Sequence, residues 1–208
     1  MRQSKHNVAP MSIEILYGLI GFAFVSSITP GPNNLMLMAS GANFGFWRTV
    51  PHMLGIALGF TLMVFLVGLG LAQIFDAYPV LHDVLKIMSV VYMTWLAWKI
   101  ANAAPPGDGE ASGTPMTFLQ AAAFQWVNPK AWAMALTAVT VYSFGPSLWA
   151  VAAVAGTFGL VNGPAVSSWT LLGTQLRRVL TNPLRLRVFN WTMAALLMAS
   201  LYPALFAA

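Results

Sequence analysis

Long apolar segments alternate with short polar ones along this chain. Each apolar segment has about 20 residues or more, the length that an α-helix needs to cross a hydrocarbon core of roughly 30 Å. The segments are too long and too evenly apolar for transmembrane β-strands, which alternate over roughly 10 residues. The pattern therefore predicts an all-α membrane protein with six spanning helices, at residues 12–44, 50–75, 84–100, 115–142, 148–172 and 188–206.

Composition supports this prediction. Of the 208 residues, 58% are hydrophobic and only 7% are charged, whereas soluble domains carry roughly 25% charged residues. The net charge of +5 does not indicate nucleic-acid binding, because the basic residues lie mostly at the ends of apolar segments. That placement is typical of determinants of membrane topology, so the expected environment is a lipid bilayer.

The basic residues also predict the orientation. With six spans, the loops after the first, third and fifth carry Arg48, then Lys99, then four arginines between residues 177 and 187. The opposite loops carry Asp76 and Asp83, with few basic residues. The first set of loops is therefore predicted to be cytoplasmic, with both termini outside.

A polar, turn-forming linker at residues 101–114 divides this single transmembrane domain, residues 1–208, into two parts. Residues 12–104 and 115–208 are each expected to hold three spans. Because three is odd, consecutive copies of such a unit enter the membrane in opposite directions, which predicts two inverted three-helix repeats. The linker is expected on the cytoplasmic side.

The first span contains a break at Thr29-Pro30-Gly31-Pro32-Asn33-Asn34. Its prolines lack backbone N–H groups, and the residues before them are pushed away from helical geometry. Carbonyl groups freed at membrane depth are tolerated only where they are buried in protein or line a wet cavity. A broken membrane helix is therefore a candidate solute site, although a surface loop or a packing kink gives the same pattern.

The fourth span contains a similar break at Asn128-Pro129-Lys130, about 16 Å along the helix. An ionisable side chain near mid-membrane favours a functional role, such as holding a substrate carboxylate or carrying a proton. The structural alternative is that Lys130 extends to the interface or binds carbonyls freed by Pro129. A second soft point, with Asn162 before Gly163-Pro164, lies in the fifth span.

The residue types at these breaks favour an anionic or zwitterionic solute. No Asp or Glu lies deep in any predicted span. Helix N-termini and Lys130 suit a carboxylate, while freed carbonyls suit an ammonium group. Amide and hydroxyl groups at the breaks are candidates to bind the rest of the solute, and each amide is equally a candidate cap for its break. These candidates are Thr29, Asn33, Asn34, Asn128 and Asn162.

Other chemistries find little support. The chain has no cysteine, and His6, His52 and His82 lack metal-ligand spacing, so we expect no metal and no cofactor. An intramembrane enzyme would need a base beside a serine, and no histidine or acid matches a serine in the spans. A membrane scaffold without transport is a further alternative, which predicts apolar filling around Thr29 and Lys130.

The two motifs together resemble the hallmarks of the LysE/RhtB family of amino-acid exporters. Leu85-Lys86 followed by Tyr92 is similar to the family's third segment. Asn182-Pro183 and Phe189-Asn190 resemble the homoserine/threonine-type branch. The chain departs from the family pattern at Ser89, where glycine is usual, and at residues 142–146, which lack the usual Pro-Gln-Phe ending.

The resemblance implies a secondary exporter of small amino acids, such as threonine, homoserine, cysteine or lysine, in the bacterial inner membrane. Many family members are driven by the proton gradient and form dimers. The family's binding motifs correspond to Thr29, Pro30, Gly31, Pro32 and Asn33 and to Asn128, Pro129 and Lys130. An exporter of another small solute or of a cation remains the alternative within transport.

Overall fold

The computed structural model describes residues 11–103, 114–145 and 147–202, and the regular structure of these residues is helical. The first half contains α1 (Ile13–Ile28), α2 (Pro32–Phe44), α3 (Phe46–Leu66), a π-helical stretch (Val67–Leu71), α4 (Ala72–Ala77) and α5 (Val80–Ala101). The second half contains α6 (Phe118–Phe124), a 3-10 turn (Gln125–Val127), α7 (Pro129–Tyr142), α8 (Leu148–Leu176) and α9 (Pro183–Ala199). The centre of the predicted linker and the end of the predicted sixth span lie outside the described residues.

Three stretches of the described chain are long and apolar enough to cross a membrane: Phe46–Phe75, Val80–Ala101 and Leu148–Leu176. The pair α1 and α2, bent by 53° at the first break, makes a fourth span if it is counted as one. The chain is therefore an all-α polytopic membrane protein, as the sequence predicts. The full count of six stays a prediction, since α6 and α7 are short and α9 has 17 residues.

Two helices differ in detail from the prediction. Helix α8 continues without a break through the predicted soft point at Asn162-Gly163-Pro164. A single proline removes only one N–H from a long helix. Helix α9 begins at residue 183 instead of 188, because the Asn182 side chain accepts from the Leu184 N–H and Pro183 suits the first helical position. Two of the arginines assigned to the basic loop, Arg185 and Arg187, therefore lie inside the helix.

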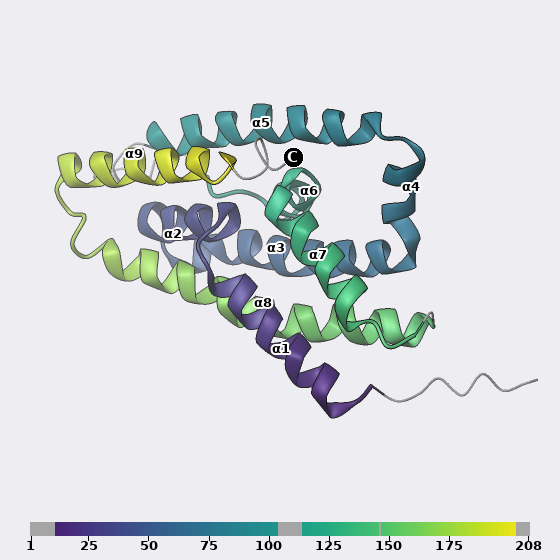
Figure 1. The fold of residues 1–208 in the computed structure, drawn as a ribbon. Coiled ribbons are helices and arrows are strands. Elements are labelled where there is room, and N and C mark those ends of the chain that lie inside the picture. The colour runs from purple at the N-terminus through teal and green to yellow at the C-terminus, as the bar shows by residue number, and fades with distance from the viewer. Residues whose placement is uncertain (1–10, 104–113, 146, 203–208) are drawn as a thin grey trace, which may run out of the picture.

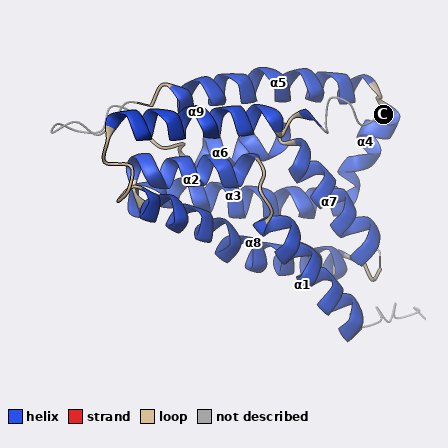
Figure 2. Ribbon diagram, turned by 60° about the vertical axis from the view of Figure 1, so that its left-hand side comes forward, coloured by secondary structure: helices blue, strands red, loops and turns tan. Residues whose placement is uncertain are grey.

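The broken helices of each half pack against the long helix of the other half. Helices α1 and α2 contact α8, and α6 contacts α3. Helices α5 and α9 pack side by side at the edge of the bundle (Figures 1 and 2). The two halves are thus interleaved, so residues that are distant in sequence meet at the centre of the bundle.

The close approach of α3 and α6 depends on two glycines one turn apart. A Cβ at Gly55 would fall on the Phe118 carbonyl, and a Cβ at Gly59 would lie 2.6 Å from the Ala122 Cα. Gly55 and Gly59 therefore form a small-residue surface at which the two helices pack.

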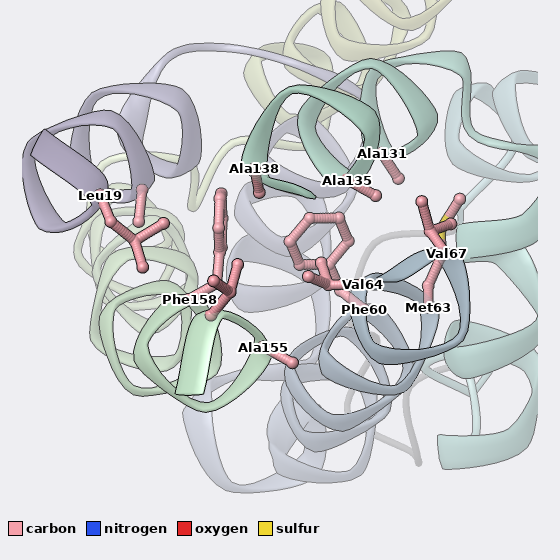
Figure 3. Packing of buried hydrophobic residues seen from close by; sticks show 12 residues of the cluster. Leu19, Phe60, Met63, Val64, Val67, Ala131, Ala135, Ala138, Ala155 and Phe158 are labelled. Carbon is pink, nitrogen blue, oxygen red and sulfur yellow. The ribbon is translucent and has the colours of Figure 1, made fainter. Parts of the chain in front are cut away.

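Alanines give α7 a similarly close contact with the core. Ala131, Ala135 and Ala138 are spaced to lie on one face of α7 and are almost completely buried. Figure 3 shows this face toward Phe60 of α3 and Phe158 of α8. The packing fixes the start of α7, and with it Lys130, next to the first break.

Candidate functional site

The two helix breaks meet at the centre of the bundle. The Lys130 ammonium of the second break donates to the Thr29 carbonyl at 2.8 Å and lies 3.0 Å from the Thr29 hydroxyl oxygen. The Pro30 carbonyl oxygen is 3.4 Å away. Among the described residues, the polar partners of this ammonium are carbonyl and hydroxyl oxygens, with no carboxylate. Lys130 of one half, which has no carboxylate partner among the described residues, thus binds carbonyl groups of the other half.

Side chains satisfy the carbonyls that the first break frees. Its two prolines lack the N–H groups that would bond to the carbonyls of Ser26 and Ile28. The Thr29 hydroxyl donates to the Ser26 carbonyl at 3.0 Å, and the Trp169 indole of α8 donates to the Ile28 carbonyl at 3.1 Å. The break is therefore held partly from within its own half and partly from the other half.

Asn34 supports the same break from the start of α2. Its amide nitrogen donates to the Ser27 carbonyl at 2.7 Å and to the Thr29 carbonyl at 2.8 Å. The contact between Asn34 and Ser27 is buried, so the Ser27 carbonyl depends on Asn34 instead of on water, whereas the Thr29 carbonyl also accepts from Lys130. Its amide nitrogen serves as a cap for the break, which is one of the two roles that the sequence left open.

The second break is held by neighbouring residues and by one residue of the first half. The Asn128 side-chain oxygen accepts from the Lys130 N–H at 3.1 Å and caps α7. The Trp132 indole donates to the Trp126 carbonyl at 2.9 Å. Ser89 of α5 places its hydroxyl 2.5 Å from the Val127 carbonyl oxygen. The serine that departs from the family's usual glycine thus contacts a carbonyl at this break.

A reciprocal amide pair joins the two breaks. Asn33 donates to the Gln125 side-chain oxygen at 2.8 Å, and Gln125 donates back at 3.1 Å. Gln125 is completely buried and also donates to the Ala121 carbonyl at 2.9 Å. Sequence reasoning missed Gln125, although a glutamine in an apolar run three residues before Asn128 was a signal for it.

A cavity of about 20 Å³ lies between the breaks and α8. Its polar lining includes residues from both breaks and from the predicted soft point of α8, and Phe60, Ala131, Met134 and Val166 add apolar walls. The polar and small lining residues are Ser26, Ser27, Gly31, Asn33, Asn34, Asn128, Lys130 and Asn162. The other predicted site residues, Thr29, Pro30, Pro32 and Pro129, shape the breaks without lining this cavity.

Two buried polar atoms at this central cavity have no hydrogen-bond partner, the Ser27 hydroxyl oxygen and the Asn162 side-chain oxygen. A buried polar group without a partner costs roughly 1–3 kcal/mol, so such atoms indicate a place for water or a ligand. The present volume is enough for about one water. The central cavity is therefore small, shared by both halves, and lined by both polar and apolar groups.

Gly31 is required by the position of Lys130. Its backbone is extended, which any residue tolerates, but a Cβ there would lie 2.7 Å from the Lys130 Cδ and 3.0 Å from its Nζ. The lysine chain therefore passes directly over a residue without a side chain, and this contact brings the ammonium to the Thr29 carbonyl.

Comparison with known proteins agrees with this architecture. The chain is 29% identical over 180 residues to the cysteine/O-acetylserine efflux protein of Escherichia coli K12, covering 81% of this chain and 87% of the relative. It is 30% identical over 168 residues to the protein of the same name from Salmonella typhimurium LT2, with 76% and 81% covered. No solved structure matches significantly. Residues 24–200 match the family described as LysE type translocator, so the chain belongs to this family of translocators and is not an enzyme.

Proposed function

We propose that this protein is a secondary exporter of small amino acids in the bacterial inner membrane. The observation that carries the proposal is the Lys130 ammonium, which bridges two proline breaks beside a polar cavity and has no carboxylate partner among the described residues. A free amino acid supplies the missing carboxylate. It also supplies an ammonium group suited to the Thr29 and Pro30 carbonyls that Lys130 occupies in this structure.

Binding then proceeds by an exchange of partners. The substrate carboxylate forms an ion pair with the Lys130 ammonium, and the substrate ammonium hydrogen-bonds to the carbonyls that Lys130 releases. Ser27 and Asn162 hold free acceptor atoms for a polar side chain. A cavity of about 20 Å³ is too small for an amino acid, so loading requires the two breaks to separate.

The interleaved packing supports movement of one half against the other. Each broken helix lies on the long helix of the opposite half, which is the arrangement that six spans in two inverted repeats would produce. Rocking of the halves would open the central cavity to one side of the membrane and then to the other. We also propose that export is driven by the proton gradient and that the protein forms dimers, because both properties are implied by the family resemblance.

The proposed substrates are small amino acids with short uncharged side chains. Relatives of this chain are named for the efflux of cysteine and O-acetylserine, while the motifs near α9 resemble the homoserine/threonine-type branch. All four compounds share one carboxylate, one ammonium and a short polar side chain. The described lining of the central cavity contains no acidic residue, which disfavours lysine-like substrates and free cations.

Export from loaded cells tests this proposal. Cells fed with dipeptides of cysteine, serine, homoserine and threonine should release at least one of these free amino acids faster when they express the protein. Lys130→Met should reduce this release at least tenfold, because it removes the proposed partner of the carboxylate. Lys86→Met changes a lysine on the exposed surface of α5 and serves as the matched control.

Unchanged release by Lys130→Met at equal membrane abundance would contradict the site assignment. Equal release with and without the protein, for every amino acid supplied, would contradict export itself. The scaffold alternative predicts apolar filling around Thr29 and Lys130, and the polar lining of the central cavity speaks against it.

A further inference from the structure

A second, larger cavity of about 80 Å³ lies between α2, α3 and α5. We call it the α2–α5 chamber, and its lining residues are Met36, Ala39, Ser40, Asn43, Phe44, His52, Leu96, Lys99, Ile100, Ala103, Thr114, Pro115 and Met116. Its volume accommodates several water-sized groups. The chamber is thus closer in size to a small amino acid than the central cavity is.

One face of α2 connects the two cavities. Asn33 lines the central cavity, and Met36, Ser40 and Asn43 follow on the same helical face and line the chamber. Ten residues of helix from Asn33 to Asn43 span about 15 Å, roughly half of a hydrocarbon core. The direction is toward the helix ends that carry Arg48 and Lys99, which the charge pattern assigns to the cytoplasm.

His52 is the unsatisfied polar group of the chamber. Its side chain is 2% exposed, and neither ring nitrogen has a hydrogen-bond partner. The other buried polar side chains of the lining are occupied: Asn43 exchanges hydrogen bonds with Asn190, and Ser40 lies 2.9 Å from the Thr49 hydroxyl. A neutral imidazole carries one donor and one acceptor, so His52 leaves both available to a guest.

Lys99 adds a positive charge to the same chamber. Its ammonium lies 4.8 Å from the centre of the Trp95 ring, which provides a cation–π contact, and no described carboxylate pairs with it. The lining contains no acidic residue, while Met36, Leu96 and Ile100 provide apolar walls. A positive end, a hydrogen-bonding imidazole and apolar walls fit a small molecule with a carboxylate and a short side chain.

We propose that the α2–α5 chamber is a second binding site, at which a small amino acid docks by its carboxylate before it enters the central cavity. This inference rests on the proposed export function and adds a loading site on the predicted cytoplasmic side. His52 hydrogen-bonds to the docked solute and Lys99 attracts its carboxylate. Neither residue touches the solute once it has reached Lys130.

Direct binding separates the chamber from the central cavity. Full-length protein with ¹⁵N-labelled histidine has only three imidazoles to assign, and reducing conditions are harmless because the chain contains no cysteine. Addition of L-cysteine should shift the His52 resonances in the wild type and equally in Lys130→Met. Cysteamine, which is cysteine without the carboxylate, should leave them unchanged at the same concentration.

Transport kinetics in inside-out vesicles provide the second test. His52→Phe or Lys99→Gln should raise the KM for cysteine at least fivefold and leave kcat within about twofold, because each weakens docking only. Lys130→Met should instead lower kcat. His82→Phe changes an exposed histidine at the start of α5 and is the matched control. Lys99→Gln keeps the test decisive if His52→Phe does not reach the membrane.

The inference is overturned if a protein that exports cysteine shows no His52 shift, or if Lys130→Met abolishes that shift. A KM unchanged in both chamber variants would overturn it as well. A wild-type protein that exports no amino acid would contradict the proposed function, and the loading site would then fall with it.

Discussion

The first and second breaks are both built around asparagine and proline, but they are held in different ways. Carbonyls of the first break depend on Lys130 of α7 and Trp169 of α8, which belong to the other half of the chain. At the second break, Asn128 caps its own helix and Trp132 reaches back six residues to Trp126. Both breaks have neutral contacts across the interface between the halves, since Ser89 contacts the Val127 carbonyl and Asn33 pairs with Gln125. A cation of the other half holds only the first break.

This difference indicates which of the two breaks can open when a substrate binds. In the proposed rocking of the halves, Asn128 and Trp132 move together with the second break, so these two contacts are retained. The Lys130 contact of the first break crosses the interface and involves a flexible cation that a substrate carboxylate can compete for. In the proposed export cycle, substrate binding therefore opens the first break, whereas Asn128 continues to cap the second.

The largest effect is expected where the first break depends on one amide. Asn34→Ala leaves the buried Ser27 carbonyl without its donor and removes one of two donors to Thr29. We expect a loss of about 2–3 kcal/mol in the free energy of unfolding, measured by denaturant titration in mixed micelles. Asn102→Ala removes an exposed amide contact at the end of α5 and should change stability by about 0.5 kcal/mol or less.

If the two asparagine variants proved equally stable, the assignment of Asn34 as the internal support of the first break would be wrong.

A second prediction concerns the contact between Gly31 and Lys130. Gly31→Ala places a methyl group where the lysine chain runs, and a flexible side chain moves aside at little cost to the fold. The ammonium is then displaced from Thr29, and export should fall about tenfold, equivalent to 1.4 kcal/mol. Gly21→Ala, whose added Cβ would have no neighbour within 4 Å outside the adjacent backbone of its own helix, should export normally. Equal export by the two variants would show that transport does not depend on the position of Lys130.

The smallest predicted effects compare the two indole donors. Trp169→Phe and Trp132→Phe each remove one hydrogen bond to a carbonyl at a break and should each cost about 1 kcal/mol of stability. Trp169→Phe should also slow export about threefold, because its bond joins α8 to the first break, whereas Trp132→Phe should not. Thermal unfolding and initial export rates measured on the same preparations check both parts. Slower export in Trp132→Phe alone would reverse our assignment of the switching break.

The sequence alone determined the helical class, the membrane environment and the positions of both breaks. Proline acts through covalent geometry, since it lacks an N–H and restricts its neighbours wherever the chain places it. The length and apolarity of each segment likewise depend only on its own residues, so they predict a membrane helix without knowledge of the rest of the chain. The soft point in α8 shows the limit of this reasoning, because one proline in a long packed helix did not break it.

Only the tertiary structure decided which groups meet at the breaks. Asn33 and Gln125 are 92 residues apart in the chain, and Thr29 and Lys130 are 101 apart, so no local rule pairs them. The same holds for His52, which looks like an ordinary histidine near a helix start until the packing of α2, α3 and α5 leaves its two nitrogens without partners. Backbone restrictions follow from each residue and its chain neighbours, whereas hydrogen-bond partners and cavities depend on how whole helices pack.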